Sequence, residues 1–143
     1  MTLHQHINKQ VANLAVLFVK IHHFHWYVKG TDFFVLHEHL EKLYDEVNDT
    51  YDTVAERLIA IGGKPASNMK NYLSLTSLVE ASTEASSKDM IKSLVEDLTS
   101  MVAEFKELIK VSTESKDDST ADLFIGLVTL FEKRIWMYSA YLK

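Results

Sequence analysis

Two pairs of potential metal ligands lie on one long predicted helix. His37 and Glu41 are four residues apart, and so are Asp52 and Glu56. On an α-helix this spacing places the members of a pair one turn apart on the same face, where both can reach one ion. Because charged residues at this spacing are also common on solvated helix faces, the spacing by itself permits either interpretation.

The four side chains share one arc of the helix. At about 100° per residue, Glu41, Asp52 and Glu56 all fall within about 100° of His37. The apolar residues of the same helix centre on a direction about 140° from this arc. We therefore expect the polar arc to point away from the core, which excludes a site inside a helical bundle.

One chain cannot bring the two pairs together. Glu41 and Asp52 are eleven residues apart, or about 16 Å along the axis, whereas metal–ligand bonds are about 2 Å long. If the helix packs antiparallel against its copy in a second chain, about a twofold axis near Val47, each pair faces the other. The sequence thus predicts two equivalent sites, each with His37 and Glu41 from one chain and Asp52 and Glu56 from its partner.

A third histidine stands in an unusual place. His25 occupies an apolar seam position of the preceding predicted helix, either as a buried neutral imidazole bonded to a backbone carbonyl or as a further ligand. Trp26 beside it is either a packing residue or an electron donor to a redox metal. The other histidines lack a carboxylate partner on a shared arc, and we predict that they lie on the surface: His4, His6, His22, His23 and His39.

Apolar spacings of three and four predict the helices that carry these residues. The first helix covers Val11–Val28 and ends near Gly30. The second, roughly thirty residues long, is capped by Thr31 or Asp32 and stops at Gly62, Gly63 and Pro65. The polar stretch from Ala66 to Ser86 is then a long connection.

Two more helices follow this connection. Ser87 is a candidate cap for a helix that runs to Ser112, and Ser119 with Asp122 forms a possible capping box for a last helix that reaches Leu142. Two helices, a long crossover and two further helices are typical of a ferritin-like four-helix bundle. We therefore predict one all-α domain spanning residues 1–143.

Composition narrows the chemistry. The 143 residues include 47% hydrophobic residues, one proline and no cysteine, so any metal must be bound by nitrogen and oxygen. The net charge of −5 disfavours nucleic acid as a partner. Without an apolar run of membrane-spanning or signal-peptide type, we expect a soluble, cytoplasmic protein.

Three segments together resemble the signature of the Dps family of mini-ferritins. They are His25-Trp26-Tyr27-Val28-Lys29-Gly30, then Phe33-Phe34-Val35-Leu36-His37-Glu38, and Asp52-Thr53-Val54-Ala55-Glu56-Arg57. The resemblance extends over almost the whole chain, including Ile61-Gly62-Gly63-Lys64-Pro65. As an ordered set, these segments are far more specific than one pair of ligands.

The resemblance implies a dodecamer built from twofold dimers, with a short helix in the crossover. It also implies oxidation of Fe(II), preferably by hydrogen peroxide rather than dioxygen, with storage of Fe(III) as protection against oxidative stress. His25 and His37 would be ligands from one subunit, and Asp52 and Glu56 from its twofold mate. Glu41 stands where the family commonly has aspartate, so both a direct and a water-mediated role are open.

Further expectations follow from the family. Asp118 and Asp122 would line an acidic threefold pore for iron entry, although acidic residues also stabilise the start of a helix. Zn(II) and other divalent ions should compete with Fe(II) for the same groups. Members that coat DNA commonly use a basic tail, whereas Met1–Gln10 holds only Lys9, so DNA compaction is not expected.

Three alternative interpretations differ in their requirements. A ferritin with a di-iron site inside each bundle needs Glu-x-x-His motifs, and no histidine here follows a glutamate at that spacing. A helical interaction module explains the apolar stripes but leaves the shared arc as coincidence. A DNA-coating structural protein without strong ferroxidase activity would need a positively charged surface.

Overall fold

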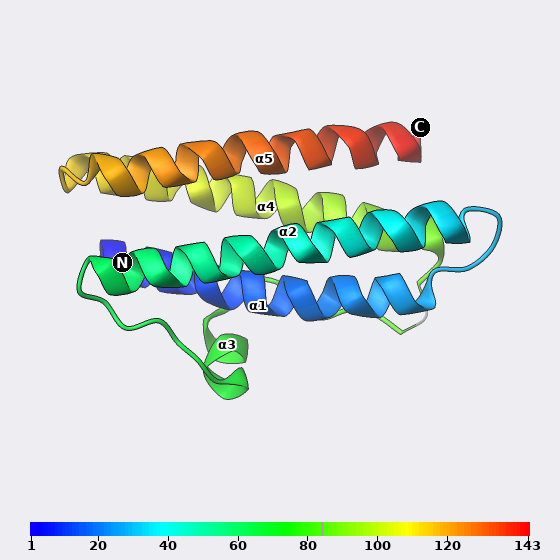
Figure 1. Cartoon of the computed structure of the whole chain (residues 1–143), viewed down its shortest axis with the longest axis horizontal. Helices are drawn as coiled ribbons and strands as arrows, with labels where there is room; N and C mark the ends of the chain where they lie inside the picture. Colours follow the sequence, from blue (N-terminus) through cyan, green and yellow to red (C-terminus); the bar gives the residue numbers. More distant parts are fainter. Residues whose placement is uncertain (84) are drawn as a thin grey trace. The chain divides into compact units, whose positions relative to one another are not determined.

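The computed structural model describes residues 1–83 and 85–143, and within these residues all regular secondary structure is helical (Figure 1). The helices are α1 (Leu3–Tyr27), α2 (Phe33–Ala60), α3 (Met69–Leu75), α4 (Ser87–Glu114) and α5 (Asp118–Leu142). This confirms the all-α prediction and the short helix, α3, within the long connection. Across the described ranges, no helix combines the length and apolar character needed to cross a membrane.

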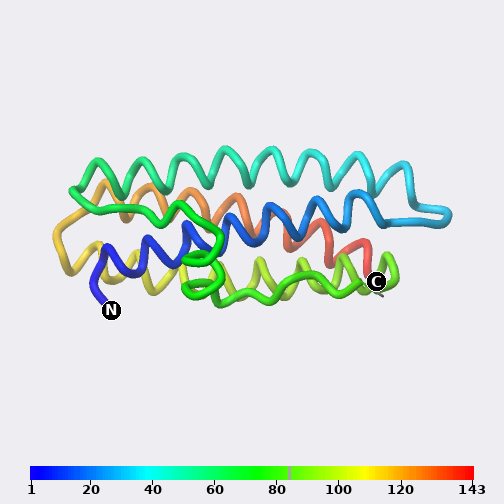
Figure 2. The backbone as a smooth tube through the Cα atoms, turned by 90° about the horizontal axis from the view of Figure 1, so that it is seen from below, coloured from blue at the N-terminus to red at the C-terminus, as the bar shows by residue number. Residues whose placement is uncertain are grey.

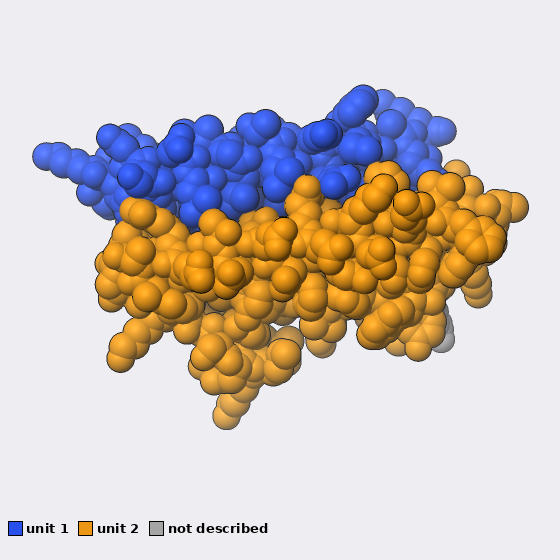
Figure 3. Space-filling view, viewed as in Figure 1, with its two compact units in different colours: residues 1–6, 91–143 blue, residues 7–90 orange. Residues whose placement is uncertain are grey.

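The chain divides into two compact units (Figure 3). One unit covers residues 7–90 and contains most of α1 together with α2 and α3. The other combines residues 1–6 with residues 91–143, which form most of α4 and all of α5. All the predicted ligands of the inter-chain site belong to the unit of residues 7–90, which is orange in Figure 3.

In the unit of residues 7–90, α1 and α2 form an antiparallel hairpin (Figure 1). The turn between them contains Gly30 at φ 95°, in the left-handed region predicted for this glycine. Every residue from Val11 to Leu17 of α1 is buried, whereas α2 buries a single stripe. That stripe is Leu36, Leu40, Leu43, Val47, Thr50, Val54 and Leu58. The opposite face of α2 is therefore available to carry polar side chains.

The connection after α2 lies alongside α1 and runs parallel to it (Figure 2). Hydrogen bonds hold it at successive levels of α1. Asn8 Oδ1 accepts from the backbone N–H of Ala66 at 2.8 Å, and the Lys20 ammonium donates to the carbonyl of Val79 at 2.8 Å. Further along, the hydroxyl of Ser87 donates to the carbonyl of Lys29 at 3.0 Å.

Asn13 is the central anchor of this connection. Its side chain is fully buried, and its Oδ1 accepts from the Thr76 hydroxyl at 2.7 Å and from the backbone N–H of Ser77 at 2.9 Å. Its Nδ2 donates to Gln10 Oε1 at 3.2 Å and to the Ser77 hydroxyl at 3.1 Å. Because each polar atom of the amide is satisfied, Asn13 can be buried between α1 and the connection without an unpaired polar atom of its own side chain.

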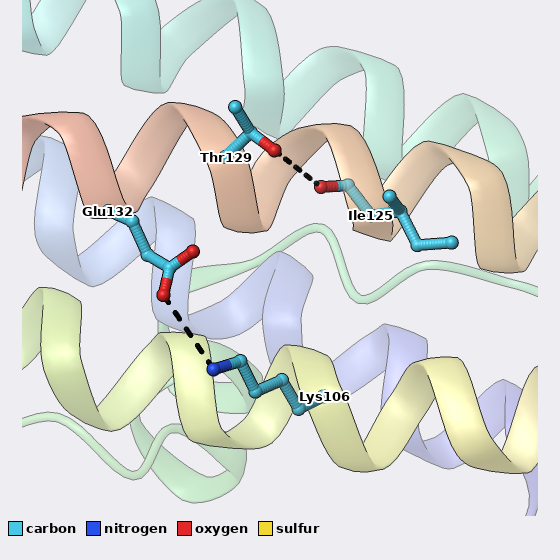
Figure 4. A network of polar contacts seen from close by, with 4 residues as sticks. All are labelled: Lys106, Ile125, Thr129 and Glu132. Carbon is cyan, nitrogen blue, oxygen red and sulfur yellow. Dashed lines mark hydrogen bonds and ion pairs between the residues drawn. The ribbon is translucent and has the colours of Figure 1, made fainter.

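In the unit of residues 1–6 and 91–143, α4 and α5 pack through aromatic rings. The Phe105 ring lies 5.3 Å from that of Phe124 and 5.1 Å from that of Phe131. On the surface, the Lys106 ammonium lies 3.7 Å from a carboxylate oxygen of Glu132 (Figure 4). Both charged side chains are largely exposed, so the aromatic contacts rather than this ion pair stabilise the α4–α5 contact.

The helix ends differ from the prediction because side-chain caps decide them. α1 begins at Leu3 rather than Val11, since Thr2 and Gln5 form a reciprocal capping box. α5 is capped by Asp117, which accepts from the backbone N–H of Thr120, and not by Ser119. A positive φ at Lys116 allows Asp117 N–H to reach the Ser112 carbonyl, so α4 ends at Glu114, two residues beyond the predicted Ser112.

The start of α4 also corrects the prediction. The hydroxyl of Ser86 accepts from the backbone N–H of Asp89 at 3.1 Å, so Ser86 provides the cap. The predicted cap, Ser87, instead bonds to Lys29, two residues beyond the end of α1.

We predict that Asn13→Ala lowers the free energy of unfolding by about 2 kcal/mol, because four hydrogen-bonding partners around a buried site lose their amide. Urea denaturation at equal subunit concentration would measure the change. Asn71→Ala, at an exposed asparagine of α3, is the matched control and should change the value by less than about 0.5 kcal/mol. Equal effects of the two substitutions would contradict the anchoring role of Asn13.

Candidate metal centre

Two reciprocal hydrogen bonds join His25 of α1 to His37 of α2. His25 Nδ1 lies 2.7 Å from the backbone carbonyl oxygen of His37, and His37 Nδ1 lies 2.7 Å from the carbonyl oxygen of His25. A carbonyl oxygen can only accept, so each Nδ1 must carry the proton and donate it. In the neutral form, each Nε2 then has a free lone pair, the form in which an imidazole binds a metal.

The two imidazole rings are stacked. Their centroids are 3.7 Å apart with an angle of 12° between the planes, and the Phe33 ring stacks on His37 at 5.0 Å. His25 is only 6% exposed. The prediction of a buried, carbonyl-bonded His25 therefore describes its Nδ1 correctly, and the same hydrogen bond orients its Nε2 for a ligand role. The two predictions for His25 are compatible.

The three carboxylates proposed for the site lie on the exposed face of α2. Glu41, Asp52 and Glu56 are all exposed. Among the residues that the structure describes, no three histidine, aspartate or glutamate side chains come close enough to hold one metal ion. Within one chain, the structure brings together His25 and His37 but does not bring Asp52 and Glu56 to them.

Tyr44 connects the histidines to Glu41. Its hydroxyl donates to Glu41 Oε1 at 3.4 Å, and its ring presents an edge contact to His25 at 5.3 Å. Burial, followed by the negative charges of Glu41 and Asp45, raises the pKa of Tyr44 above its ordinary value. The phenol therefore stays protonated at neutral pH and remains a hydrogen-bond donor to the carboxylate.

The prediction that the remaining histidines lie on the surface is confirmed for His4, which is exposed, and is wrong for the other four, which are half-buried. His22 is half-buried and stacks on Tyr44, with centroids 3.8 Å apart. His23 and His39 are also half-buried. His23 lies beside the connection, since it lines a pocket together with Met69, Tyr72 and Ala81. The i,i+4 spacing of Phe18, His22 and Trp26 in the sequence indicates that their rings share one face of α1.

The other predicted residues, Trp26, Asp118 and Asp122, are all exposed. Trp26 is 66% exposed and makes an edge contact with His22 at 5.6 Å. Asp118 lies in the first turn of α5, and both it and Asp122 are exposed. Exposed carboxylates at these positions are compatible both with lining a pore for iron entry and with stabilising the start of α5.

Comparison with known proteins identifies the family. The Ferritin-like domain family matches residues 4–143. DNA protection during starvation protein 2 of Bacillus anthracis is 45% identical over 136 residues, covering 95% of this chain and 93% of that protein. General stress protein 20U of Bacillus subtilis is 43% identical, covering 96% and 95% of the two chains.

The chain belongs to the Dps family of mini-ferritins. The crystal structure of a Dps protein from Bacillus brevis matches with a TM-score of 0.97 and 40% identity, over 99% of this chain and 95% of that one. Dps from Listeria innocua, from a crystal soaked with zinc, matches with a TM-score of 0.95 and 41% identity, over 98% and 95%. The ferritin-like helical bundle predicted from the sequence is thereby confirmed.

We predict that His25 and His37 of this Dps protein are both protonated on Nδ1 when neutral, which is the less common tautomer of a free imidazole. Solid-state NMR of protein labelled with ¹⁵N-histidine would show an unprotonated Nε2 signal for each of the two residues, assigned by its loss in the His25→Gln and His37→Gln variants. Exposed His4 is the internal reference. Protonated Nε2 signals at neutral charge for both residues would contradict the reciprocal hydrogen bonds.

Proposed function

We propose that this protein oxidises Fe(II) at sites shared between two copies of the chain and stores the Fe(III) product inside a shell of twelve subunits. The observation that carries the proposal is the reciprocal pair of hydrogen bonds between His25 and His37, which leaves two adjacent Nε2 lone pairs fixed in orientation. Histidine ligands of metals are usually held in this way by a second hydrogen bond.

The carboxylates complete the proposed site from a second chain. Asp52 and Glu56 are exposed one turn apart on α2, so an antiparallel copy of α2 would place them opposite His37 and Glu41. Two imidazole nitrogens with two or three carboxylate oxygens suit Fe(II), and also Zn(II), which should compete. Because carboxylates are hard and anionic, they stabilise Fe(III) more than Fe(II) and so favour oxidation.

Hydrogen peroxide is the proposed oxidant, with dioxygen as the alternative. Two Fe(II) ions lose one electron each, and one peroxide accepts both electrons with two protons. The O–O bond breaks and two water molecules form. Since both electrons can be delivered together at one site, no hydroxyl radical needs to be released. The proposed activity therefore combines iron storage with protection against oxidative stress, in line with the stress-related names of the relatives.

Related proteins add support for the histidine pair. Solved structures of Listeria innocua Dps include crystals soaked with zinc and with cobalt, and two variants in which a single histidine is replaced by glycine. The two substituted histidines are twelve positions apart in that protein. His25 and His37 have the same separation here.

A DNA-coating structural role is the second candidate, because several relatives are named for DNA protection during starvation. The net charge of −5 opposes tight binding to phosphate, since non-specific DNA affinity comes mainly from lysine and arginine contacts. Protection of DNA by removal of Fe(II) and peroxide requires no such contact. We therefore favour ferroxidase activity.

We predict that Asp52→Asn, Glu56→Gln slows peroxide-driven oxidation of anaerobic Fe(II) by at least about tenfold, because both partner ligands lose their charge. Stopped-flow absorbance of the ferric product measures the rate. Asp89→Asn, Glu96→Gln, at two exposed positions of α4, makes the same chemical change elsewhere and should leave the rate unchanged. If the native protein and both variants oxidise Fe(II) no faster than a solution without protein, Asp52 and Glu56 are ordinary solvent-exposed residues. That result would favour the DNA-coating role.

A further inference from the structure

Tyr44 lies at the centre of an aromatic cluster that links both helices of the candidate site. One face of its ring stacks on His22 of α1 at 3.8 Å, and His25 meets the ring at an angle of 86°. From the same ring, the hydroxyl reaches Glu41 Oε1. Tyr44 thus contacts one imidazole and one carboxylate of the proposed site while contributing no ligand itself.

The stacking partner of Tyr44 is itself fixed. His22 Nδ1 lies 2.9 Å from the backbone carbonyl of Phe18, so this nitrogen carries a proton and donates it. The His22 ring also makes edge contacts with Phe18 at 4.5 Å and with Trp26 at 5.6 Å. Because three contacts hold His22, its flat face defines the plane in which the Tyr44 ring can lie.

Glu41, like Glu56, is a ligand candidate with a long and flexible side chain. Its side chain is exposed and has one methylene more than an aspartate, so fixing it costs more rotamer entropy. Within its own chain, the Tyr44 hydroxyl is a donor positioned one helical turn away. At 3.4 Å the hydrogen bond is longer than the usual 2.7–2.8 Å, and such contacts commonly shorten when a site is occupied.

We propose that Tyr44 is a positioning residue that holds Glu41 beside His37, and so makes the longer carboxylate of this chain a direct participant in metal binding. The inference rests on the proposed inter-chain site and deepens it. Ring stacking on His22 keeps the phenol in place, and the phenol hydrogen bond leaves the second Glu41 oxygen to face the metal. Packing alone would need the ring but not the hydroxyl.

Removal of the hydroxyl is therefore the test. We predict that Tyr44→Phe weakens Co(II) binding to the metal-free protein about three- to tenfold, as expected for the loss of one ordinary, solvent-exposed hydrogen bond. In a Glu41→Gln background, the same substitution should have almost no effect, because the two residues act as one unit. Calorimetric titration gives the affinity, and the Co(II) d–d absorption spectrum reports the ligand geometry.

Tyr51→Phe is the matched control, since it removes a phenol hydroxyl from the same helix at a residue that bonds Tyr72, whereas Glu41 is bonded by Tyr44. It should leave the affinity and the spectrum unchanged. Native-like Co(II) affinity and spectrum in Tyr44→Phe would overturn the positioning role while leaving the metal site intact. If Tyr44→Phe weakens Co(II) binding equally in the native and in the Glu41→Gln background, the positioning role is also overturned. Absence of stoichiometric Co(II) binding in the native protein would overturn the proposed site and this inference together.

Discussion

The pair of hydrogen bonds between His25 and His37 is the constraint on which the site depends. The carbonyl of His25 lies in the last turn of α1, where helix carbonyls lack partners within their own helix. His37 supplies the missing donor, and His25 returns the same interaction to α2. One contact therefore closes the end of a helix, joins two helices and sets the tautomer of two potential metal ligands.

The surrounding architecture makes the contact between His25 and His37 possible, but one chain alone does not complete the proposed metal site. Asn13 and Lys20 anchor the long connection along α1, which keeps α1 buried and lets its last turn meet the first turns of α2. The single buried stripe of α2 leaves Asp52 and Glu56 exposed on the other side. Since a helix cannot fold back on itself, the proposed site needs carboxylates from a second copy.

Apolar periodicity predicted the helices well because burial imposes it on every turn. It could not place their ends, which depend on single hydrogen bonds: those of Thr2, Ser86 and Asp117. The shared arc of α2 and the seam position of His25 were visible in the sequence for the same geometric reason. The stacking of His22 on Tyr44 was not, because contacts between helices depend on their rotation and register, which one helix pattern does not specify.

The central claim is that one site needs ligands from two chains, and complementation tests it most directly. Two double variants are made: one carries His25→Ala with His37→Ala, and the other carries Asp52→Asn with Glu56→Gln. Each double variant alone should be inactive as an Fe(II) oxidase. When the two are co-expressed and co-assembled in equal amounts, random twofold pairing restores native ligand sets at about a quarter of the sites. We expect peroxide-driven oxidation to return to about a quarter of the native rate. Mixed assemblies as inactive as the separate variants would contradict a shared site.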